Sequence, residues 1–341
     1  MVRLLISLGS NKQMRQLLKR FSSSDAMHFA VLKIGGGVLE GAQLKSLVSS
    51  IEFLKKVGFF PIVVHGGGPQ LNAELDKAGE EPKYVEGMRV TSPKVLGIAL
   101  RVFEKENTKL VEALEQAGVR ARPVSGVFEA TPLDVNTYGL VGKVTKIHSD
   151  VLASSILSGY VPVLTSLGMS PEGQVLNINA DVAALELAKE IHPLKILFIN
   201  TTAGMLDGDG KLITRIRLSE EYDNLMKQPW VKHGTRLKLR EFKNCLDALP
   251  PSASVSIVSP ENVPAELFEP RGLGTHISKG ERVVSHSSLE HVDLGRVRTL
   301  LEESFKAPLK PTYFEELAKR LHRIYITESN DVCTDFFVPT Q

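Results

Sequence analysis

Between residues 29 and 258, the hydrophobic positions follow two alternating patterns. Short runs rich in Val and Ile predict buried strands, and longer stretches with apolar residues three or four positions apart predict helices. The expected strands are 29–34, 61–65, 121–124, 161–165, 195–199 and 255–258. The expected helices are 41–57, 69–79, 92–117, 149–159, 180–191 and 235–248. This alternation indicates an α/β fold with a mainly parallel sheet flanked by helices.

Two local features refine this pattern. Thr235 precedes the apolar stripe of the last helix, and we expect its hydroxyl to cap that helix. The run from Asp207 to Gly210 predicts a hairpin turn between short strands at 205–206 and 212–213, and we assign it no catalytic role.

The pattern changes near Gly280, where a largely polar stretch begins. A helix is expected behind Asp293, a second helix at 312–323 and a strand at 324–327, whereas 330–341 carries no periodic pattern. One or two helices with a single strand cannot enclose a core. We therefore divide the chain into a main domain at 27–280 and, at 281–341, a linker with an incomplete α+β domain.

The N-terminal segment, residues 1–26, has two interpretations. Its first 24 residues contain basic residues and several serines but no acid, which is typical of a mitochondrial transit peptide. Met14, Leu17, Leu18 and Phe21 also have the spacing of an amphipathic helix. We favour a retained helix because no clear cleavage signal closes the segment.

Composition excludes several classes of protein. The chain has 341 residues, of which 43% are hydrophobic and 23% charged, as in an ordinary globular protein. A net charge of +2, with acids and bases interleaved, argues against nucleic-acid binding. Cys245 and Cys333 lack the spacing of a metal site, so we expect no protein-bound metal. No apolar run has the length of a membrane span.

The strongest candidate chemistry lies in two glycine clusters that follow predicted strands. Lys33 precedes the first cluster, Gly35 to Gly37, and His65 precedes the second, Gly66 to Gly68. Glycines let backbone N–H groups converge on an anion, and a following helix adds its positive end. Each cluster by itself is also compatible with a tight turn. Neither fits the Walker or the Rossmann signature, which disfavours both classes.

Four further side chains could carry chemistry. Arg89 lies in a short link between two predicted helices, where its planar guanidinium could bind a carboxylate through two hydrogen bonds. The simpler interpretation is a solvated surface arginine. Asn177 and Asp181 belong to a segment that follows a short predicted strand and opens a helix, where such residues often serve only as caps. Lys238 lies in the first turn of its helix, which is unfavourable unless an anion is nearby.

Taken in order, these residues resemble the amino acid kinase family, and within it the acetylglutamate kinases of fungal mitochondrial type. The resemblance covers about residues 11–285. Its most specific motifs are the Lys33 glycine loop, HGGGPQ at 65–70, GMRVT at 87–91, LNINADVAA at 176–184 and the segment 234–238. It implies a three-layer αβα sandwich, and the tail from about His291 resembles the start of an acetyltransferase-like domain.

The resemblance implies ATP-dependent phosphorylation of the side-chain carboxylate of N-acetyl-L-glutamate, with Mg²⁺ accompanying ATP. The implied catalytic residues are Lys33, Lys238 and Asp181. The implied substrate-binding residues are Gly67, Gly68, Arg89 and Asn177. The implied nucleotide-binding residues are Gly35, Gly36, Thr201 and Gly204. Thr201 departs from the aspartate of many bacterial kinases, which leaves the adenine contacts open.

Regulation and location also follow from the resemblance. It implies inhibition by L-arginine, a homo-oligomer, association with an N-acetylglutamate synthase and residence in the mitochondrial matrix. The implied effector residues are Phe21, Glu266, Gly272 and Gly274. An alternative is that the chain is the arginine-sensing, kinase-like domain of an N-acetylglutamate synthase. We expect no acetyl transfer by the chain itself, because its sequence stops before an acetyl-CoA loop.

Overall fold

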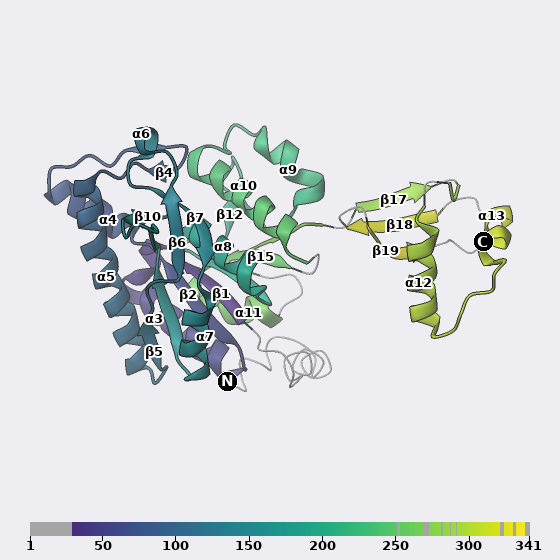
Figure 1. The fold of residues 1–341 in the computed structure, drawn as a ribbon, viewed down its shortest axis with the longest axis horizontal. Helices are drawn as coiled ribbons and strands as arrows, with labels where there is room; N and C mark the ends of the chain where they lie inside the picture. Colours follow the sequence, from purple (N-terminus) through teal and green to yellow (C-terminus); the bar gives the residue numbers. More distant parts are fainter. Residues whose placement is uncertain are drawn as a thin grey trace.

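A computed structural model describes residues 29–250, 253–268, 273–280, 282–286, 288–290, 292–320, 324–329 and 332–337. The N-terminal segment, and with it the predicted amphipathic helix, lies outside the described residues. The main body contains a central sheet, helices on both of its faces, and a smaller sheet (Figure 1). This is the three-layer α/β architecture expected above.

The central sheet has eight strands in the order β14-β16-β15-β11-β1-β2-β8-β5. Their bounds are β1 (Phe29–Ile34), β2 (Phe60–His65), β5 (Ala121–Pro123), β8 (Val161–Thr165), β11 (Lys195–Ile199), β14 (Arg215–Arg217), β15 (Ser254–Val258) and β16 (Thr275–Ser278). All neighbouring pairs are parallel except β15 and β16. In the centre of the sheet, β1 lies between β2 and β11, so Lys33 is paired in register with Val64 and Phe198.

Alternate residues of β1 belong to two different cores, because successive side chains in a strand point to opposite faces. Leu32 and Ile34 pack on the face covered by α3 (Gly41–Lys56) and the C-terminal half of α5 (Pro93–Gln116). Val31 packs on the other face, which is covered by α7 (Ser149–Leu157), α8 (Ala180–Ile191) and α10 (His233–Ala248). Lys33 belongs to this second face, and it is therefore directed toward α8 and α10.

The predicted strands and helices of the main body are confirmed to within about two residues. One capping prediction is wrong. The helix predicted from Thr235 begins at His233, and Lys232 is its N-cap residue. The Thr235 N–H already donates to the Lys232 carbonyl at 3.0 Å, so Thr235 lies inside the first turn. The hairpin of β12 (Met205–Leu206) and β13 (Leu212–Ile213) forms as predicted.

A second, four-stranded sheet was not predicted from the sequence. It consists of β6 (Phe128–Pro132), β7 (Gly142–Ile147), β9 (Leu167–Met169) and β10 (Val175–Asn177), in the order β10-β9-β6-β7. A two-stranded hairpin, β3 (Tyr84–Val85) with β4 (Met88–Arg89), replaces the simple link expected around Arg89. The remaining main-body helices are α4 (Gly68–Lys77), α6 (Val135–Tyr138), α9 (Leu218–Met226) and α11 (Val263–Phe268), with short 3₁₀ turns at Gly36–Leu39 and Pro260–Asn262.

The region after Gly280 contains more structure than predicted. Three antiparallel strands, β17 (Arg282–His286), β18 (Ile324–Ser329) and β19 (Val332–Phe337), accompany α12 (Leu294–Phe305) and α13 (Tyr313–Arg320) beside the main body (Figure 1). Asp293 caps α12 as expected, by accepting from the Arg296 N–H at 2.9 Å. The expectation of no regular structure beyond 330 is wrong, because β19 pairs along β18 and completes a small sheet. Val292 and Val297 centre a small apolar cluster there.

Candidate active site

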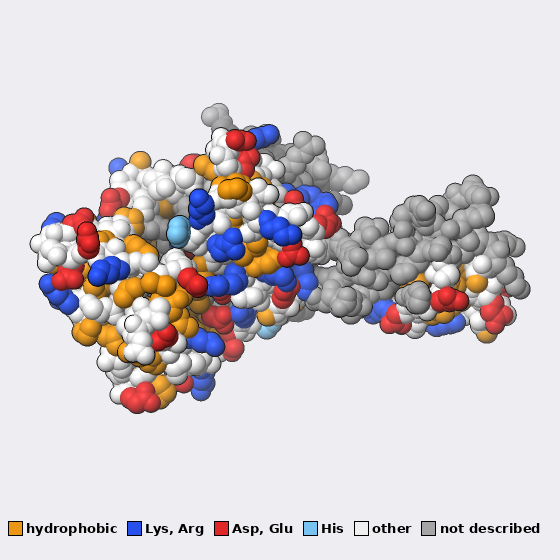
Figure 2. All heavy atoms as spheres, turned by 90° about the horizontal axis from the view of Figure 1, so that it is seen from above, with side chains coloured by type: hydrophobic (Ala, Val, Ile, Leu, Met, Phe, Trp, Pro, Cys, Tyr) orange, Lys and Arg blue, Asp and Glu red, His pale blue; other side chains and the backbone are white. Residues whose placement is uncertain are grey.

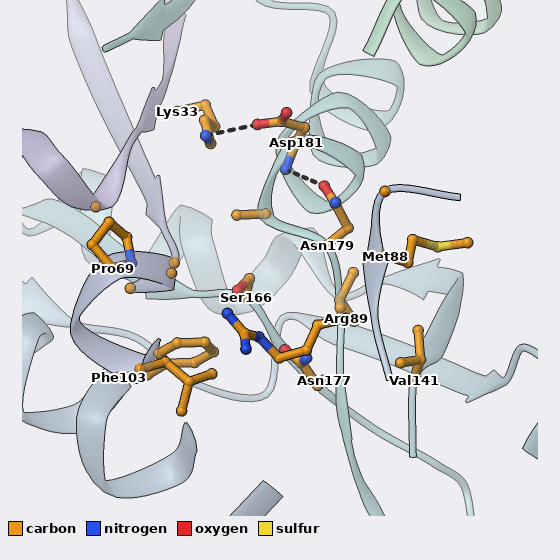
Figure 3. A pocket seen from close by; sticks show the side chains of 18 of the residues that line it. Lys33, Pro69, Met88, Arg89, Phe103, Val141, Ser166, Asn177, Asn179 and Asp181 are labelled. Carbon is orange, nitrogen blue, oxygen red and sulfur yellow. Dashed lines mark hydrogen bonds and ion pairs between the residues drawn. The ribbon is translucent and has the colours of Figure 1, made fainter. Parts of the chain in front are cut away.

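A cavity of about 290 Å³ opens at the carboxyl ends of β1 and β2. In an open parallel sheet this is the edge at which ligands bind. The residues predicted for the site that line this cavity are Lys33, Gly36, Gly67, Gly68, Arg89, Asn177 and Asp181. Figure 3 shows that Lys33 and Asp181 lie on one side of the cavity and Arg89 and Asn177 on another. Segments more than a hundred residues apart in the sequence thus meet in one space.

Asp181 holds two lysines from different elements. The Lys33 Nζ lies 2.7 Å from Asp181 Oδ1, and the Lys238 Nζ lies 3.6 Å from Asp181 Oδ2 (Figure 3 draws the first contact). The three side chains are only 12%, 22% and 17% exposed for Lys33, Lys238 and Asp181. The carboxylate therefore separates two ammonium groups that would otherwise repel each other.

The charge state of Asp181 is set by these two neighbours. Burial alone raises the pKa of a carboxyl group, but the positive charges of Lys238 and Lys33, together with their hydrogen bonds, lower the pKa of Asp181 to about 2. Asp181 is therefore ionised at neutral pH. The three groups carry a net positive charge that is available to an anion in the cavity.

Arg89 presents a partly buried guanidinium to the same cavity. Its Nη2 donates to Asn72 Oδ1 and to the Tyr84 hydroxyl, each at 2.5 Å. The guanidinium carbon also lies 4.8 Å from the centre of the Tyr84 ring. Its Nη1 is buried without a hydrogen-bond partner. Burial lowers the pKa of Arg89, although an arginine remains charged at neutral pH. The unpaired nitrogen marks a place for an anionic oxygen.

The segment before α8 divides its roles among three residues. Asn179 is the helix cap, since its Oδ1 accepts from the backbone N–H of Asp181 at 2.9 Å. Asn177 is buried at the end of β10, and its Nδ2 donates to Thr91 Oγ1 at 3.0 Å. Asp181 is thus left free to bind the lysines. The capping interpretation therefore applies to Asn179, and neither Asn177 nor Asp181 serves as the cap.

The glycines of the two clusters differ in what surrounds them. A β-carbon on Gly36 would lie 2.6 Å from Pro69 Cδ, and one on Gly67 would lie 3.2 Å from the Phe103 ring. Gly36 therefore requires glycine for close packing of the two loops, whereas Gly67 packs tightly against Phe103 of α5. Gly68 has no atom within 4 Å of that position, and it lines the cavity as the first residue of α4. The start of α4 directs its positive end at the cavity.

Three predicted nucleotide residues, Gly35, Thr201 and Gly204, and the predicted catalytic residue Lys238 lie outside the lining of this cavity. Thr201 borders the first glycine loop, with its Cγ2 3.1 Å from where a β-carbon of Gly37 would lie. Gly204 is enclosed by Thr275 and Leu212, at 2.5 and 2.6 Å from the equivalent point. Gly35 donates its N–H to the Ile199 carbonyl at the head of the same loop. The assignment of these residues to nucleotide binding stays a prediction.

The two predicted effector residues that the structure describes, Glu266 and Gly274, form no part of the lining of the cavity. Glu266 is buried, accepts from the Leu273 N–H at 3.3 Å and lies 3.9 Å from His276 Nδ1. A β-carbon on Gly274 would lie 2.0 Å from the Ile257 carbonyl oxygen, so packing alone demands glycine there. Phe21 and Gly272 lie outside the described residues.

Sequence reasoning missed several residues that shape the cavity. Thr91 is fully buried, donates its hydroxyl to the Arg89 carbonyl at 3.0 Å and accepts from Asn177. Phe103 on α5 underlies Gly67, and Ser166 lines the cavity after β8. Thr91 belongs to the GMRVT motif, so its position was visible in the sequence. Phe103 has no such signal, because it lies in an ordinary apolar stripe.

The sequence of this chain is similar to a known protein family and to several characterised proteins. The profile of the Amino acid kinase family matches residues 28–251. "Bifunctional protein argC, mitochondrial" of Dictyostelium discoideum is 64% identical over 271 residues, which is 79% of this chain and 32% of that protein. "Acetylglutamate kinase" of Xanthomonas campestris is 49% identical over 323 residues, 94% of this chain and 75% of that protein. The chain thus spans less than a third of the first relative and three quarters of the second.

A solved structure with a similar fold is N-acetylglutamate synthase of Neisseria gonorrhoeae, crystallised with coenzyme A and N-acetyl-glutamate. It matches with a TM-score of 0.77 at 20% identity, over 98% of this chain and 78% of that one. At this identity the likeness concerns the fold alone. No helix among the described residues has the length and apolar character needed to cross a membrane. The family match and the Xanthomonas relative together show that this chain belongs to the amino acid kinase family.

Proposed function

We propose that this chain transfers the γ-phosphoryl group of ATP to the side-chain carboxylate of N-acetyl-L-glutamate. The observation that carries the proposal is the contact of Asp181 with both Lys33 and Lys238, at a cavity that Asp181 and Lys33 line together with Arg89. The identity to curated acetylglutamate kinases supports the same activity. The reaction belongs to arginine biosynthesis.

The main obstacle to this phosphoryl transfer is the repulsion between two anionic substrates, and the reaction needs no general base. A carboxylate with a pKa near about 4.3 is already ionised at neutral pH, so no proton has to be removed. Its oxygen attacks the γ-phosphorus, the bond to the β–γ bridging oxygen breaks, and ADP leaves. Lys33 and Lys238 stabilise the negative charge that is shared between the attacking and leaving oxygens. Asp181 is the positioning residue that holds the two ammonium groups apart.

The substrates enter from opposite sides of this cluster. Arg89 and Asn177 bind the acetylglutamate, together with the backbone of Gly67 and Gly68, and the orphaned Nη1 of Arg89 supports this role. The nucleotide lies toward Gly35, Gly36, Thr201 and Gly204.

Mg²⁺ accompanies ATP through its phosphate oxygens. Asp181 is the one acid among the residues that line the cavity, and both lysines already engage it. No group of three or more His, Cys, Asp or Glu side chains in the described part of the chain has the arrangement of a metal site. This donor set fits a metal that is brought by the nucleotide better than one held by the protein.

Regulation and context extend the proposal. L-arginine inhibits the enzyme at a site that includes Phe21, Glu266, Gly272 and Gly274, and a synthase crystallised with L-arginine has a similar fold. We propose the same division into domains as above, 1–26, 27–280 and 281–341, with the last part related to the acetyltransferase-like region. The chain forms a homo-oligomer, and it associates with an N-acetylglutamate synthase. The mitochondrial names of several relatives support the mitochondrial matrix as its location.

A coupled ADP-release assay with N-acetyl-L-glutamate tests the activity. We expect turnover by the wild type, and losses of about 10²-fold or more in kcat for Lys33→Ala and Lys238→Ala. Lys77→Ala is the matched control, because its side chain is 70% exposed and pairs only with Glu74 on the surface. Arginine binding without any acetylglutamate-dependent turnover would instead identify a regulatory domain.

A further inference from the structure

The hairpin that carries Arg89 ends in a tight two-residue turn. Val85 pairs with Met88, and the turn residues Glu86 and Gly87 both have positive φ, +48° and +85°. This is the type I′ turn that suits a two-residue hairpin. Gly87 at the tip of the hairpin and Arg89 both line the cavity described above.

The tip of the hairpin contacts the start of α10. A β-carbon on Gly87 would lie 3.0 Å from Gly234 Cα, 3.1 Å from Gly234 N and 3.2 Å from the His233 carbonyl carbon. Two backbones therefore touch with no side chain between them. Gly234 itself has space for a side chain, since a β-carbon added there would have no atom within 4 Å.

Two non-glycine residues at the same contact have positive φ. In the described part of the chain, the non-glycine residues with positive φ are Glu86, His192, His233 and Lys306. Glu86 and His233 face each other across the hairpin tip and the first residue of α10. Such conformations persist where surrounding structure holds them, and they cluster at sites where function uses them.

Electrostatic attraction also favours contact between the hairpin tip and the start of α10. Glu86 is the one acid among the residues that line a cavity of about 550 Å³ at the start of α10. The basic residues of that cavity are Lys227, Lys232, His233, Arg236 and Arg240. Figure 2 shows several Lys and Arg side chains gathered near the middle of the main body on the upper face. The basic wall and the positive end of α10 both attract the Glu86 carboxylate.

The two elements that meet at this contact each carry one residue of the proposed site. Gly87 is two residues from Arg89, which binds acetylglutamate in the proposed function. Gly234 is four residues from Lys238, one helical turn along the same face. A shift of the hairpin tip therefore moves Arg89 at one end and the start of the Lys238 helix at the other.

We propose that Glu86, Gly87 and Gly234 form an interlock that couples acetylglutamate binding to the position of Lys238. The inference rests on the proposed function. When acetylglutamate holds the hairpin, the tip braces the start of α10 and keeps Lys238 at Asp181. Bound nucleotide, which holds Lys238, in turn favours the docked hairpin, because coupling between two sites is reciprocal. These three are positioning residues, since none reaches the reacting atoms.

The test measures the affinity for acetylglutamate by calorimetry, with and without a non-hydrolysable ATP analogue and Mg²⁺. In the wild type we expect the analogue to tighten binding by about tenfold. Gly87→Ala pushes the tip away from Gly234, so we expect that factor to fall to about one and kcat to fall by about 10- to 100-fold. Gly173→Ala is the matched control, because Gly173 is also a hairpin-turn glycine, with φ +88°, and has open space around it.

A second pair of variants does not alter the turn glycine. Glu86→Lys places a positive charge against the basic wall, and we expect it to reduce the coupling factor, whereas Glu86→Gln reduces it less. If Gly87→Ala and Glu86→Lys keep the wild-type coupling and a kcat within about twofold of Gly173→Ala, the interlock is wrong. Turnover by the wild type in the same preparation tests the proposed function separately. Failure of the interlock can therefore be distinguished from failure of the proposed kinase activity.

Discussion

Asp181→Asn tests the electrostatic core of the site most directly. The change keeps the size of the side chain but removes the negative charge between two ammonium groups, at 2.7 Å from Lys33 and 3.6 Å from Lys238. The two lysines are then left facing each other in a partly buried site. We expect the variant to fold, to lose stability and to lose most of its turnover.

The magnitude of the stability loss follows from the pKa of Asp181. That pKa is lowered from 3.8 to about 2, which at about 1.4 kcal/mol for each pH unit corresponds to roughly 2 kcal/mol. A carboxyl group whose folded-state pKa is lowered stabilises the protein above its unfolded pKa. This contribution decreases as the pH falls from about 4 to about 2. The difference in unfolding free energy between wild type and Asp181→Asn is therefore expected to stay constant between about pH 5 and pH 8.

The effect on catalysis differs for the two kinetic parameters. Without Asp181, mutual repulsion displaces Lys33 and Lys238 from their catalytic positions, and we expect kcat to fall by about 10²- to 10³-fold. The uncompensated positive charge still attracts the phosphates of ATP, so the affinity for ATP is expected to stay the same or to increase. A simple loss of folding would instead lower the concentration of active enzyme and leave both parameters of the folded fraction unchanged.

Denaturant unfolding at several pH values and coupled ADP-release kinetics measure both expectations. Asp76→Asn, an exposed aspartate on α4, serves as the control. The reasoning is refuted if Asp181→Asn retains kcat within about twofold of this control. It is also refuted if the stability difference varies with pH between about pH 5 and pH 8, since another group would then be responsible.

Three further predictions concern substrate, nucleotide and effector binding. Arg89→Lys should raise the KM for acetylglutamate by about tenfold, more than it lowers kcat, because one ammonium group cannot replace the planar fork; an unchanged KM contradicts this. Gly68→Ala should raise the KM for acetylglutamate without lowering Tm, because no atom lies within 4 Å of the added methyl group. Gly36→Ala, at a predicted nucleotide residue, should lower Tm, since its methyl group would meet Pro69 at 2.6 Å; thermal unfolding and kinetics separate the two. Glu266→Gln should raise the arginine concentration for half-inhibition by about tenfold or more. Unchanged activity and oligomer size of the wild type in millimolar arginine contradicts the proposed effector site.

The central sheet could be predicted because its strands are buried on both faces. Runs such as Val161 to Leu164 are continuously apolar, and burial on both sides is what selects such a sequence. Three strands of the smaller sheet, β6, β7 and β9, were missed for the opposite reason, whereas a short strand was expected just before Asn177 and is confirmed as β10. In β7 the pattern from Gly142 to Ile147 is interrupted by exposed lysines, and β9 has only three residues. A segment this short carries too little periodicity by itself to indicate a strand.

The site residues could be predicted only as separate motifs. Lys33, Asp181 and Lys238 were found because each is unusual in its local setting: a charge at the end of a buried strand, an excess polar residue at a helix start, and a cation at the positive end of a helix. Their distances are a property of the fold. Gly87 was visible only as part of the Arg89 motif, because its contact with Gly234 joins segments that no local pattern connects.

The site contains two lysines and an aspartate, Lys33, Lys238 and Asp181, although a single lysine would carry the same net charge. The arrangement of these charges explains why. Two ammonium groups without a carboxylate would have to be desolvated against their mutual repulsion. Asp181 holds both lysines in place, yet it cancels only one of the two charges. The remaining positive charge, together with Arg89, is present before any ligand arrives, so it requires no reorganisation when two anions are brought together. A site built for anion–anion chemistry needs this excess, and a fully neutralised cluster would not supply it.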